Sequence, residues 1–228
     1  MSFGPIMKFK TATGMHVELA PFERDEVTQL TRGQQRLSVL RYMGMANMAQ
    51  TDGLEQDWYD KAAKKVKDLM WGIWVVEGKN RKLIGATSIN EIGPHVASQP
   101  NITQGTTGIS IADTQYWGRG VASAAHKART YFAFKQLGII RLKSAVAQAN
   151  QASRIALERS GYSYVYTERN FQFVNGHYVH EDNLECLNPD DWAWRLWWGD
   201  DRPTRKAIEA RERTRQALEW AKQNVELP

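Results

Sequence analysis

The sequence lacks several features that would place it in a special class of protein. Its one cysteine, Cys186, cannot form an internal disulfide and provides no cysteine cluster for a metal. No apolar run approaches the roughly 18 residues of a membrane-spanning helix. The first residues, MSFGPIMKFK, show no apolar stretch followed by a small-residue cleavage site, so no secretory signal is predicted. These absences predict a cytoplasmic protein with no metal site.

The composition is that of an ordinary globular protein. Hydrophobic residues make up 42% of the chain and charged residues 24%, which argues against disordered and collagen-like classes. A length of 228 residues allows one sizeable domain, or one domain with an appendage. The net charge of +5 suits an anionic ligand, a phosphorylated cofactor or nucleic acid, and does not choose among them.

The order of the predicted elements indicates a mixed α/β (α+β) sheet, with strands first in hairpins and then alternating with helices. Runs of β-branched and aromatic residues predict strands at 15–22, 71–77, 82–92, 106–113, 141–147, 162–173 and 178–187. Length and composition predict helices at 24–41, 54–69, 120–137 and 150–160. The pair Asn175-Gly176 is a strong hairpin signal between the last two strands. The polar, Gly- and Pro-containing residues 93–105 are predicted to form a loop.

The composition changes near residue 190. The segment DDWAWRLWWGDD contains four tryptophans, which we expect to pack against the rest of the chain or a second subunit: Trp192, Trp194, Trp197 and Trp198. Stacking on a substrate or on nucleic-acid bases is the alternative.

Residues 202–225 carry a small-residue stripe at helical spacing, which predicts an amphipathic helix through Ala207, Ala210, Thr214, Ala217, Ala221 and Val225. Asp200 or Asp201 is expected to cap this helix, with Pro203 in its first turn. We therefore predict two units, a domain at 1–189 and a Trp-rich linker with a C-terminal helix at 190–228. The helix docks on its own domain or contributes to a homodimer.

The stretch ISIADTQYWGRGVA, residues 109–122, carries the strongest functional signal. A predicted strand leads into a turn with Gly118 and Gly120, and then into the start of a long helix. Glycines let the backbone approach a ligand closely, and a helix N-terminus presents unpaired N–H groups and a partial positive charge. Arg119 adds a cation that can reach a phosphate. The spacing alone fits a pyrophosphate site and a tight connection without a ligand equally well.

The residues around this turn resemble the GNAT superfamily of N-acetyltransferases, and in particular its RimJ/RimL type. QYWGRG matches the superfamily signature Q/R-x-x-G-x-G/A. The string YWGRGVASAAHKARTYFAFKQLGIIRLKSAVAQANQASRIALERSGY follows the RimJ/RimL-type pattern throughout. The resemblance covers roughly residues 15–187 and does not include the tail. It implies the GNAT acyl-CoA N-acyltransferase fold with a helical C-terminal extension, and acetyl-CoA as the donor.

The resemblance also implies where acetyl-CoA binds. The strand before the turn would splay away from the next strand, and pantetheine would pair with the backbone of Ile109, Ser110 and Ile111. Gln115 belongs to the signature, and the pyrophosphate would be held by the amides of Gly118, Arg119, Gly120, Val121 and Ala122. Asn150 would contact the pantetheine arm, and Ser153 would protonate the departing thiolate. Asn150 and Ser153 also suit a helix N-cap and first turn without any cofactor.

The resemblance identifies no general base. At the positions where relatives carry acidic or phenolic residues, this sequence has Thr106, Ala145, Leu157 and Gln172. The remaining candidates each also suit a surface or strand-end role: Glu91, Asp113, His177, His180 and Glu181. Only a neutral amine attacks a thioester, and near pH 7.5 an α-amine with a pKa of about 7.7–8.0 is neutral far more often than a lysine at about 10.4. A site without a carboxylate base therefore favours a protein N-terminus as acceptor.

Three alternatives stay open. The acceptor is a small amine, such as a polyamine or an antibiotic, or it is an amino group carried on nucleic acid, such as an aminoacyl-tRNA or a modified base. The basic charge allows the nucleic-acid acceptor but does not favour it. The third alternative is a non-catalytic binding protein that retains the fold, although a scaffold has no need of an intact pyrophosphate turn. No membrane partner is expected.

Overall fold

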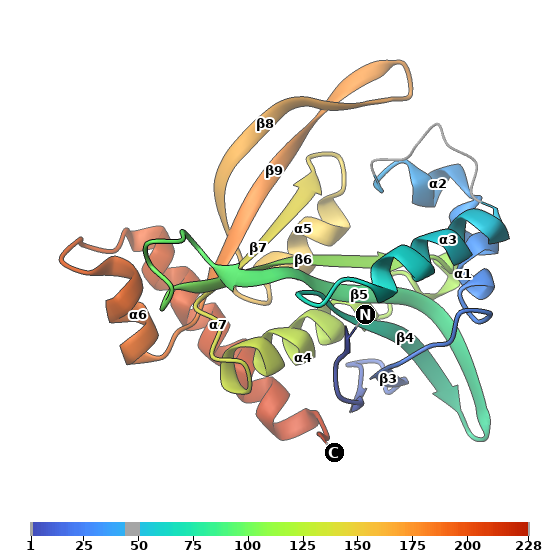
Figure 1. The fold of residues 1–228 in the computed structure, drawn as a ribbon, viewed down its shortest axis with the longest axis horizontal. Coiled ribbons are helices and arrows are strands. Elements are labelled where there is room, and N and C mark those ends of the chain that lie inside the picture. Colours follow the sequence, from blue (N-terminus) through green and yellow to red (C-terminus); the bar gives the residue numbers. More distant parts are fainter. Residues whose placement is uncertain (1, 44–50, 228) are drawn as a thin grey trace.

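The computed structural model describes residues 2–43 and 51–227 (Figure 1). The described strands form one mixed sheet in the order β2-β3-β4-β5-β6-β7-β9-β8, with β1 paired to β4. The strands are β1 (Ser2–Phe3), β2 (Met7–Lys10), β3 (His16–Ala20), β4 (Leu69–Glu77), β5 (Asn80–Pro94), β6 (Thr103–Ile111), β7 (Arg141–Ala147), β8 (Ser163–Val174) and β9 (His177–Leu187). The helices are α1 (Thr28–Gln34), α2 (Leu37–Leu40), α3 (Asp52–Ala63), α4 (Val121–Lys135), α5 (Gln151–Glu158), α6 (Asp191–Trp198) and α7 (Arg205–Asn224).

The mixed α/β prediction is confirmed, and β1, β2 and α6 are additional elements. The helix predicted at 24–41 is broken into α1 and α2, because Arg36 adopts an extended backbone between them. The helix predicted at 54–69 ends at Ala63, and Asp68 instead accepts a hydrogen bond from the backbone N–H of Glu91 (2.9 Å). The loop predicted at 93–105 is shorter, because Gly93 and Pro94 pair with β6.

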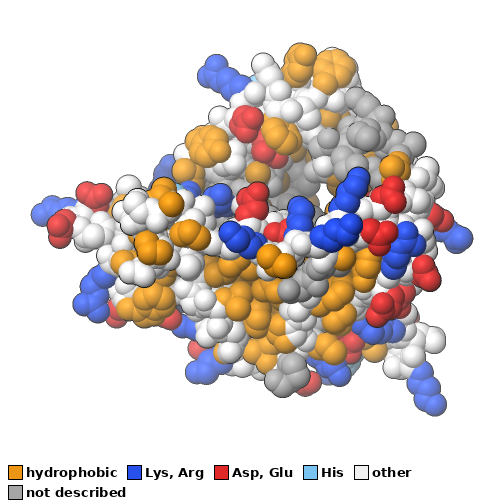
Figure 2. Space-filling view, viewed as in Figure 1, with side chains coloured by type: hydrophobic (Ala, Val, Ile, Leu, Met, Phe, Trp, Pro, Cys, Tyr) orange, Lys and Arg blue, Asp and Glu red, His pale blue; other side chains and the backbone are white. Residues whose placement is uncertain are grey.

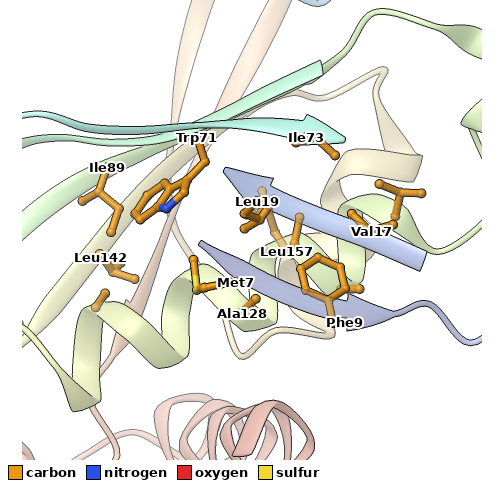
Figure 3. Close-up of a cluster of buried hydrophobic side chains, with 14 of the residues drawn as sticks. Met7, Phe9, Val17, Leu19, Trp71, Ile73, Ile89, Ala128, Leu142 and Leu157 are labelled. Carbon is orange, nitrogen blue, oxygen red and sulfur yellow. The ribbon is translucent and has the colours of Figure 1, made fainter. Parts of the chain in front are cut away.

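The main core lies between the sheet and α4. Side chains from β2, β3 and β4, among them Met7, Leu19 and Trp71, point toward Ala128 on this helix (Figure 3). The alanines on the buried face of α4 allow the helix to lie close to the sheet. This packing fixes the N-terminus of α4 at the end of β6, where the glycine turn lies. A second core on the opposite face joins α1 to the sheet through Phe22, Leu30, Trp74 and Leu83.

The tail folds against the rest of the chain. α7 packs on α4 and β9 along the predicted stripe, with Ala210, Thr214, Ala217, Leu218 and Ala221 buried. Phe9 and Trp220 meet edge to face with ring centroids 6.4 Å apart. Backbone hydrogen bonds between Lys8 and Glu226, of 3.0 and 2.8 Å, join the end of the tail to β2. The boundary between residues 189 and 190 stays a prediction.

The segment predicted as a Trp-rich linker is itself helical, as α6. Trp194 is buried and Trp197 packs against Ile102 and Ile140, whereas Trp192 is about half exposed (51%), so the predicted packing is confirmed only in part. The predicted cap of α7 is wrong: the N-cap is Thr204, whose side chain accepts a hydrogen bond from the backbone N–H of Ala207 (3.2 Å). Threonine is a good cap residue, and Thr204 directly precedes the first residue of the helix. Asp200 and Asp201 lie too far before the helix to cap it.

Among the helices of the described residues, none combines the length and the apolar character that a membrane crossing requires.

Candidate functional site

β6 and β7 run side by side only over their first residues. Residues 104–106 pair in parallel with residues 141–143, and two side-chain bonds mark the end of the pairing. Thr107 Oγ1 donates to the carbonyl of Lys143 (3.0 Å), and Ser144 Oγ donates to the carbonyl of Thr107 (3.3 Å). Beyond this point β6 pairs only with β5, and β7 pairs only with β9. The two strands therefore diverge before residue 109, as the resemblance implied, and leave a gap between them.

The turn after β6 has a backbone suited to an anion. Gly118 and Gly120 have φ angles of +72° and +79°, and Gly120 is the N-cap of α4. A Cβ on Gly118 would meet nothing within 4 Å, and one on Gly120 nothing nearer than 3.8 Å. No hydrogen bond found in the described part of the chain uses the backbone N–H of Gly118, Arg119 or Gly120. Free N–H groups, open space and a helix N-terminus together fit a pyrophosphate.

Hydrogen bonds around the turn hold it in place. Asp113 accepts from the backbone and side-chain N–H groups of Gln115 (3.2 and 2.7 Å) and from Lys82 Nζ (2.8 Å). Burial acts to raise the pKa of Asp113, but the bonds from Lys82 and Gln115 outweigh it and lower that pKa below its usual value. Asp113 is thus an ionised, paired carboxylate that orders the turn. The indole of Trp117 donates to the carbonyl of Ile111 (2.9 Å), so that carbonyl already has a partner.

Asn150 and Ser153 lie across the gap, where β7 leads into α5. Asn150 is the N-cap of α5, and its Oδ1 accepts from the backbone N–H of Ser153 (3.2 Å). Both side chains are partly exposed, so both remain accessible to a ligand. The capping interpretation of Asn150 is therefore confirmed, and its contact with a cofactor, like that of Ser153, stays a prediction.

A buried cation lies behind β6. Arg129 on α4 is fully buried and donates to the carbonyl of Gly108 (2.7 Å) and to His126 Nδ1 (2.8 Å). Burial, and then the charge of Arg129, hold the pKa of His126 well below its ordinary value, so the imidazole is neutral and its Nδ1 accepts. Arg129 thereby fixes the backbone of β6 where the gap opens. Nothing in the sequence distinguishes this arginine from a surface residue of α4.

A cavity of about 310 Å³ opens on the other face of β6. Residues 85–88 and 108–110 form its floor. Its walls come from α1, from α3 and from Tyr42 and Met43, which follow α2. Figure 2 shows the molecule hollowed between the β8–β9 hairpin and the side of α2 and α3, with both basic and acidic side chains along the rim. A larger cavity of about 470 Å³, lined by Arg32, Arg36 and Lys82, lies beyond Ala112 and does not reach residues 108–111.

The carboxylate in the smaller cavity is Glu55, which is not among the bases suggested by the sequence. Glu91 and His177 are exposed, and His180 Nδ1 accepts from the backbone N–H of Asn170 (3.0 Å). Burial and the nearby Glu168 raise the pKa of Glu181, but Glu181 does not line the cavity. Helical spacing places Glu55 on one face of α3 with Tyr59 and Ala62, but the sequence gives no sign that this face borders a cavity.

The family model described as "Acetyltransferase (GNAT) domain" matches residues 16–163, which is more than half of the chain. The chain belongs to the GNAT family. The predicted fold and family are thereby confirmed. A comparison with curated protein sequences finds no significant match. Within the described residues, no group of three or more His, Cys, Asp or Glu side chains is placed to hold a metal.

Solved structures of GNAT proteins share this fold at low sequence identity. RimJ from Mycobacterium smegmatis, in complex with CoA-disulfide, is 17% identical with a TM-score of 0.65, over 85% of this chain and 93% of that one. RimL, a ribosomal L7/L12 α-N-protein acetyltransferase in complex with coenzyme A, is 16% identical with a TM-score of 0.62, over 75% and 93%. Spermidine N-acetyltransferase from Vibrio cholerae, in complex with CoA and spermine, is 16% identical with a TM-score of 0.64, over 75% and 95%.

Proposed function

We propose that this protein transfers the acetyl group of acetyl-CoA to a primary amine, and that the acceptor is the α-amine of a protein N-terminus. The observation that carries the proposal is the arrangement along β6. A turn with unpaired backbone N–H groups lies at its end, a gap runs along its edge, and a cavity opens on its opposite face at residues 108–110. Such a strand suits a ligand with a pyrophosphate at one end and a reactive thioester at the other.

The residues present fit acetyl-CoA. The N–H groups at Gly118, Arg119, Gly120, Val121 and Ala122 would bind the pyrophosphate, and the edge of β6 at Ile109 and Ser110 would bind the pantetheine amides. The carbonyl of Ile111 is already bonded to Trp117, which restricts the pairing expected there. Asn150 would contact the pantetheine arm, and Ser153 would give its proton to the departing thiolate. CoA is bound in the RimJ, RimL and spermidine N-acetyltransferase structures, which supports the same co-substrate here.

The acceptor cavity favours a single ammonium group over a polyamine. Glu55 is the one acidic residue among the described residues that line it, and Leu30, Met43 and Met70 make much of the wall apolar. A polyamine brings further positive charges that need further acids, because an unpaired buried charge is costly. A volume of about 310 Å³ is at the small end for ligand sites and suits a group the size of one residue.

The nucleic-acid acceptor has weaker support. The larger cavity contains Arg32, Arg36 and Lys82, yet Lys82 pairs with Asp113 (2.8 Å), and Asp52 also lines this cavity. Arg36 is bonded to the side chain of Thr114 (2.9 Å). These partners neutralise or occupy much of the basic character that a phosphate backbone would require.

The test is incubation of the purified protein with acetyl-CoA and a panel of amines, with release of free thiol as the readout. The panel contains a short peptide with a free N-terminus, the same peptide with a blocked N-terminus and a lysine, spermidine, and an aminoacyl-tRNA. We expect thiol release with the first peptide and little with the blocked one. Release with spermidine or the tRNA alone would contradict the acceptor, and release with none of the panel would contradict the acetyltransferase activity.

A further inference from the structure

Two buried side chains in the cavity beside β6 offer hydrogen-bond acceptors without partners. Gln34 is only 6% exposed, and its Oε1 has no hydrogen-bond partner among the residues that the structure describes. Glu55 is 8% exposed and lines the same cavity, and no hydrogen bond or ion pair to its carboxylate is found within residues 2–43 and 51–227. Buried polar groups are normally paired, so two unpaired acceptors facing one cavity point to a ligand that donates.

The rest of the cavity fits the same ligand. Tyr42 and Trp58 contribute aromatic side chains, and an ammonium group is attracted to the face of such rings. An ammonium group has three N–H donors and no acceptor, so it complements an amide oxygen, a carboxylate and an aromatic wall. Among the described lining residues there is no Lys, Arg or His to repel it.

The cavity also places that ammonium group next to the reaction. Gly108, Ile109 and Ser110 line it, and these residues follow the point where β6 and β7 diverge. We propose that Gln34 and Glu55 bind the acceptor ammonium group, and that the Glu55 carboxylate takes the proton that must leave before the amine attacks. This inference rests on the proposed function, because it requires the thioester to lie along the same segment of β6.

Burial raises the pKa of Glu55 above its ordinary value of 4.5. A general base is most effective when its pKa approaches the working pH, so an upward shift makes this carboxylate a stronger base. An unpaired buried carboxylate destabilises the fold, and a role in binding or catalysis accounts for its presence.

The proposed step balances in atoms and charge. Glu55 removes one proton from the ammonium group, and the nitrogen lone pair then attacks the carbonyl carbon of the thioester. A C–N bond forms, the C–S bond breaks, and its electron pair leaves with the sulfur as thiolate. The Ser153 hydroxyl, in the role that the proposed function gives it, donates its proton to that sulfur and regains one from the second proton lost by the nitrogen. The proton on Glu55 returns to water, which resets the base.

The decisive variant is Glu55→Gln, which keeps the shape of the side chain and removes the base. With the most reactive amine of the panel, we expect kcat/KM at pH 7 to fall by ~10²–10⁴-fold. The acidic limb of the pH profile should disappear, while the affinity for CoA measured by calorimetry stays unchanged. Gln34→Leu should mainly raise KM for the amine. Asp57→Asn, on the exposed face of the same helix, is the matched control and should behave as wild type.

A Glu55→Gln variant with wild-type kcat/KM and the wild-type pH profile would overturn this inference while leaving the acetyltransferase activity intact. If the wild-type chain itself releases no thiol with any amine, the proposed function fails first. Glu55→Asp gives a second test, because it keeps a carboxylate: it should restore the acidic limb at a reduced rate. Failure of Glu55→Asp to differ from Glu55→Gln would also count against a role as base.

Discussion

Replacement of Gly120 by alanine separates the cost of backbone strain from the loss of a ligand site. Gly120 has a φ of +79°, and a Cβ placed there meets nothing nearer than 3.8 Å. In the free protein the substitution therefore destabilises the fold through backbone strain and not through a steric clash. A non-glycine residue in this left-handed region costs about 1–2 kcal/mol. For a chain of this size that cost lowers Tm by roughly 2–8 °C. If the turn of the variant relaxed to another conformation to avoid this strain, CoA binding would have to return the turn to its strained conformation. That cost would lower the affinity by roughly 5–30-fold.

A Cβ that also blocks the approach of the pyrophosphate should therefore reduce CoA affinity by more than about 30-fold, beyond what strain explains. Gly138→Ala is the matched control. Gly138 has a φ of +63°, its Cβ would meet nothing within 4 Å, and it lies past the other end of α4. Both variants should lose similar Tm, and only Gly120→Ala should lose affinity in a calorimetric titration with CoA. If Gly120→Ala binds within about 5-fold of wild type, the turn is not the pyrophosphate site.

Three further predictions follow from the structure. Ser153→Ala should lower turnover by ~10²-fold or less, and unchanged turnover would leave Ser153 as a first-turn helix residue. Removal of the chain from Asp190 onward should reduce solubility or Tm, because it uncovers α4, while the remaining soluble protein binds CoA normally; full solubility with loss of acceptor turnover alone would place the tail in the substrate site. Because the folded state raises the pKa of Glu55, its contribution to stability is greatest below pH 4.5 and is lost as pH rises through the folded-state pKa. Glu55→Gln should therefore raise Tm at pH 8 relative to wild type, and have little effect at pH 4.

The sequence predicted those parts of the fold that local patterns determine. The Asn175-Gly176 turn has positive φ at both residues, as a tight hairpin requires, and β7 has the predicted bounds. The glycine turn was found because left-handed backbone requires particular residue types. Glu55 and Arg129 were not found, because burial of a charged side chain depends on elements distant in sequence. Helical spacing shows which residues share a face, but not whether that face borders a cavity.

The caps show the same limit at a smaller scale. Asp200, Asp201 and Thr204 are all good caps by type, and which one is used depends on where the chain leaves α6. The tryptophans of α6 were expected to pack against the rest of the chain or a second subunit. Trp194 is buried but Trp192 is about half exposed, because only one side of this short helix faces the body of the protein.

The pairing of Lys8 with Glu226 has a consequence for synthesis of the protein on the ribosome. Residue 8 leaves the ribosome well before residue 226, which completes its hydrogen bonds, because most of the described chain lies between them. The apolar side of α4 that α7 covers is exposed throughout that interval. Contacts between such distant segments form slowly, and uncovered apolar surface promotes aggregation of a growing chain. The yield of native protein should therefore depend on how well the cell protects the nascent chain until α7 docks.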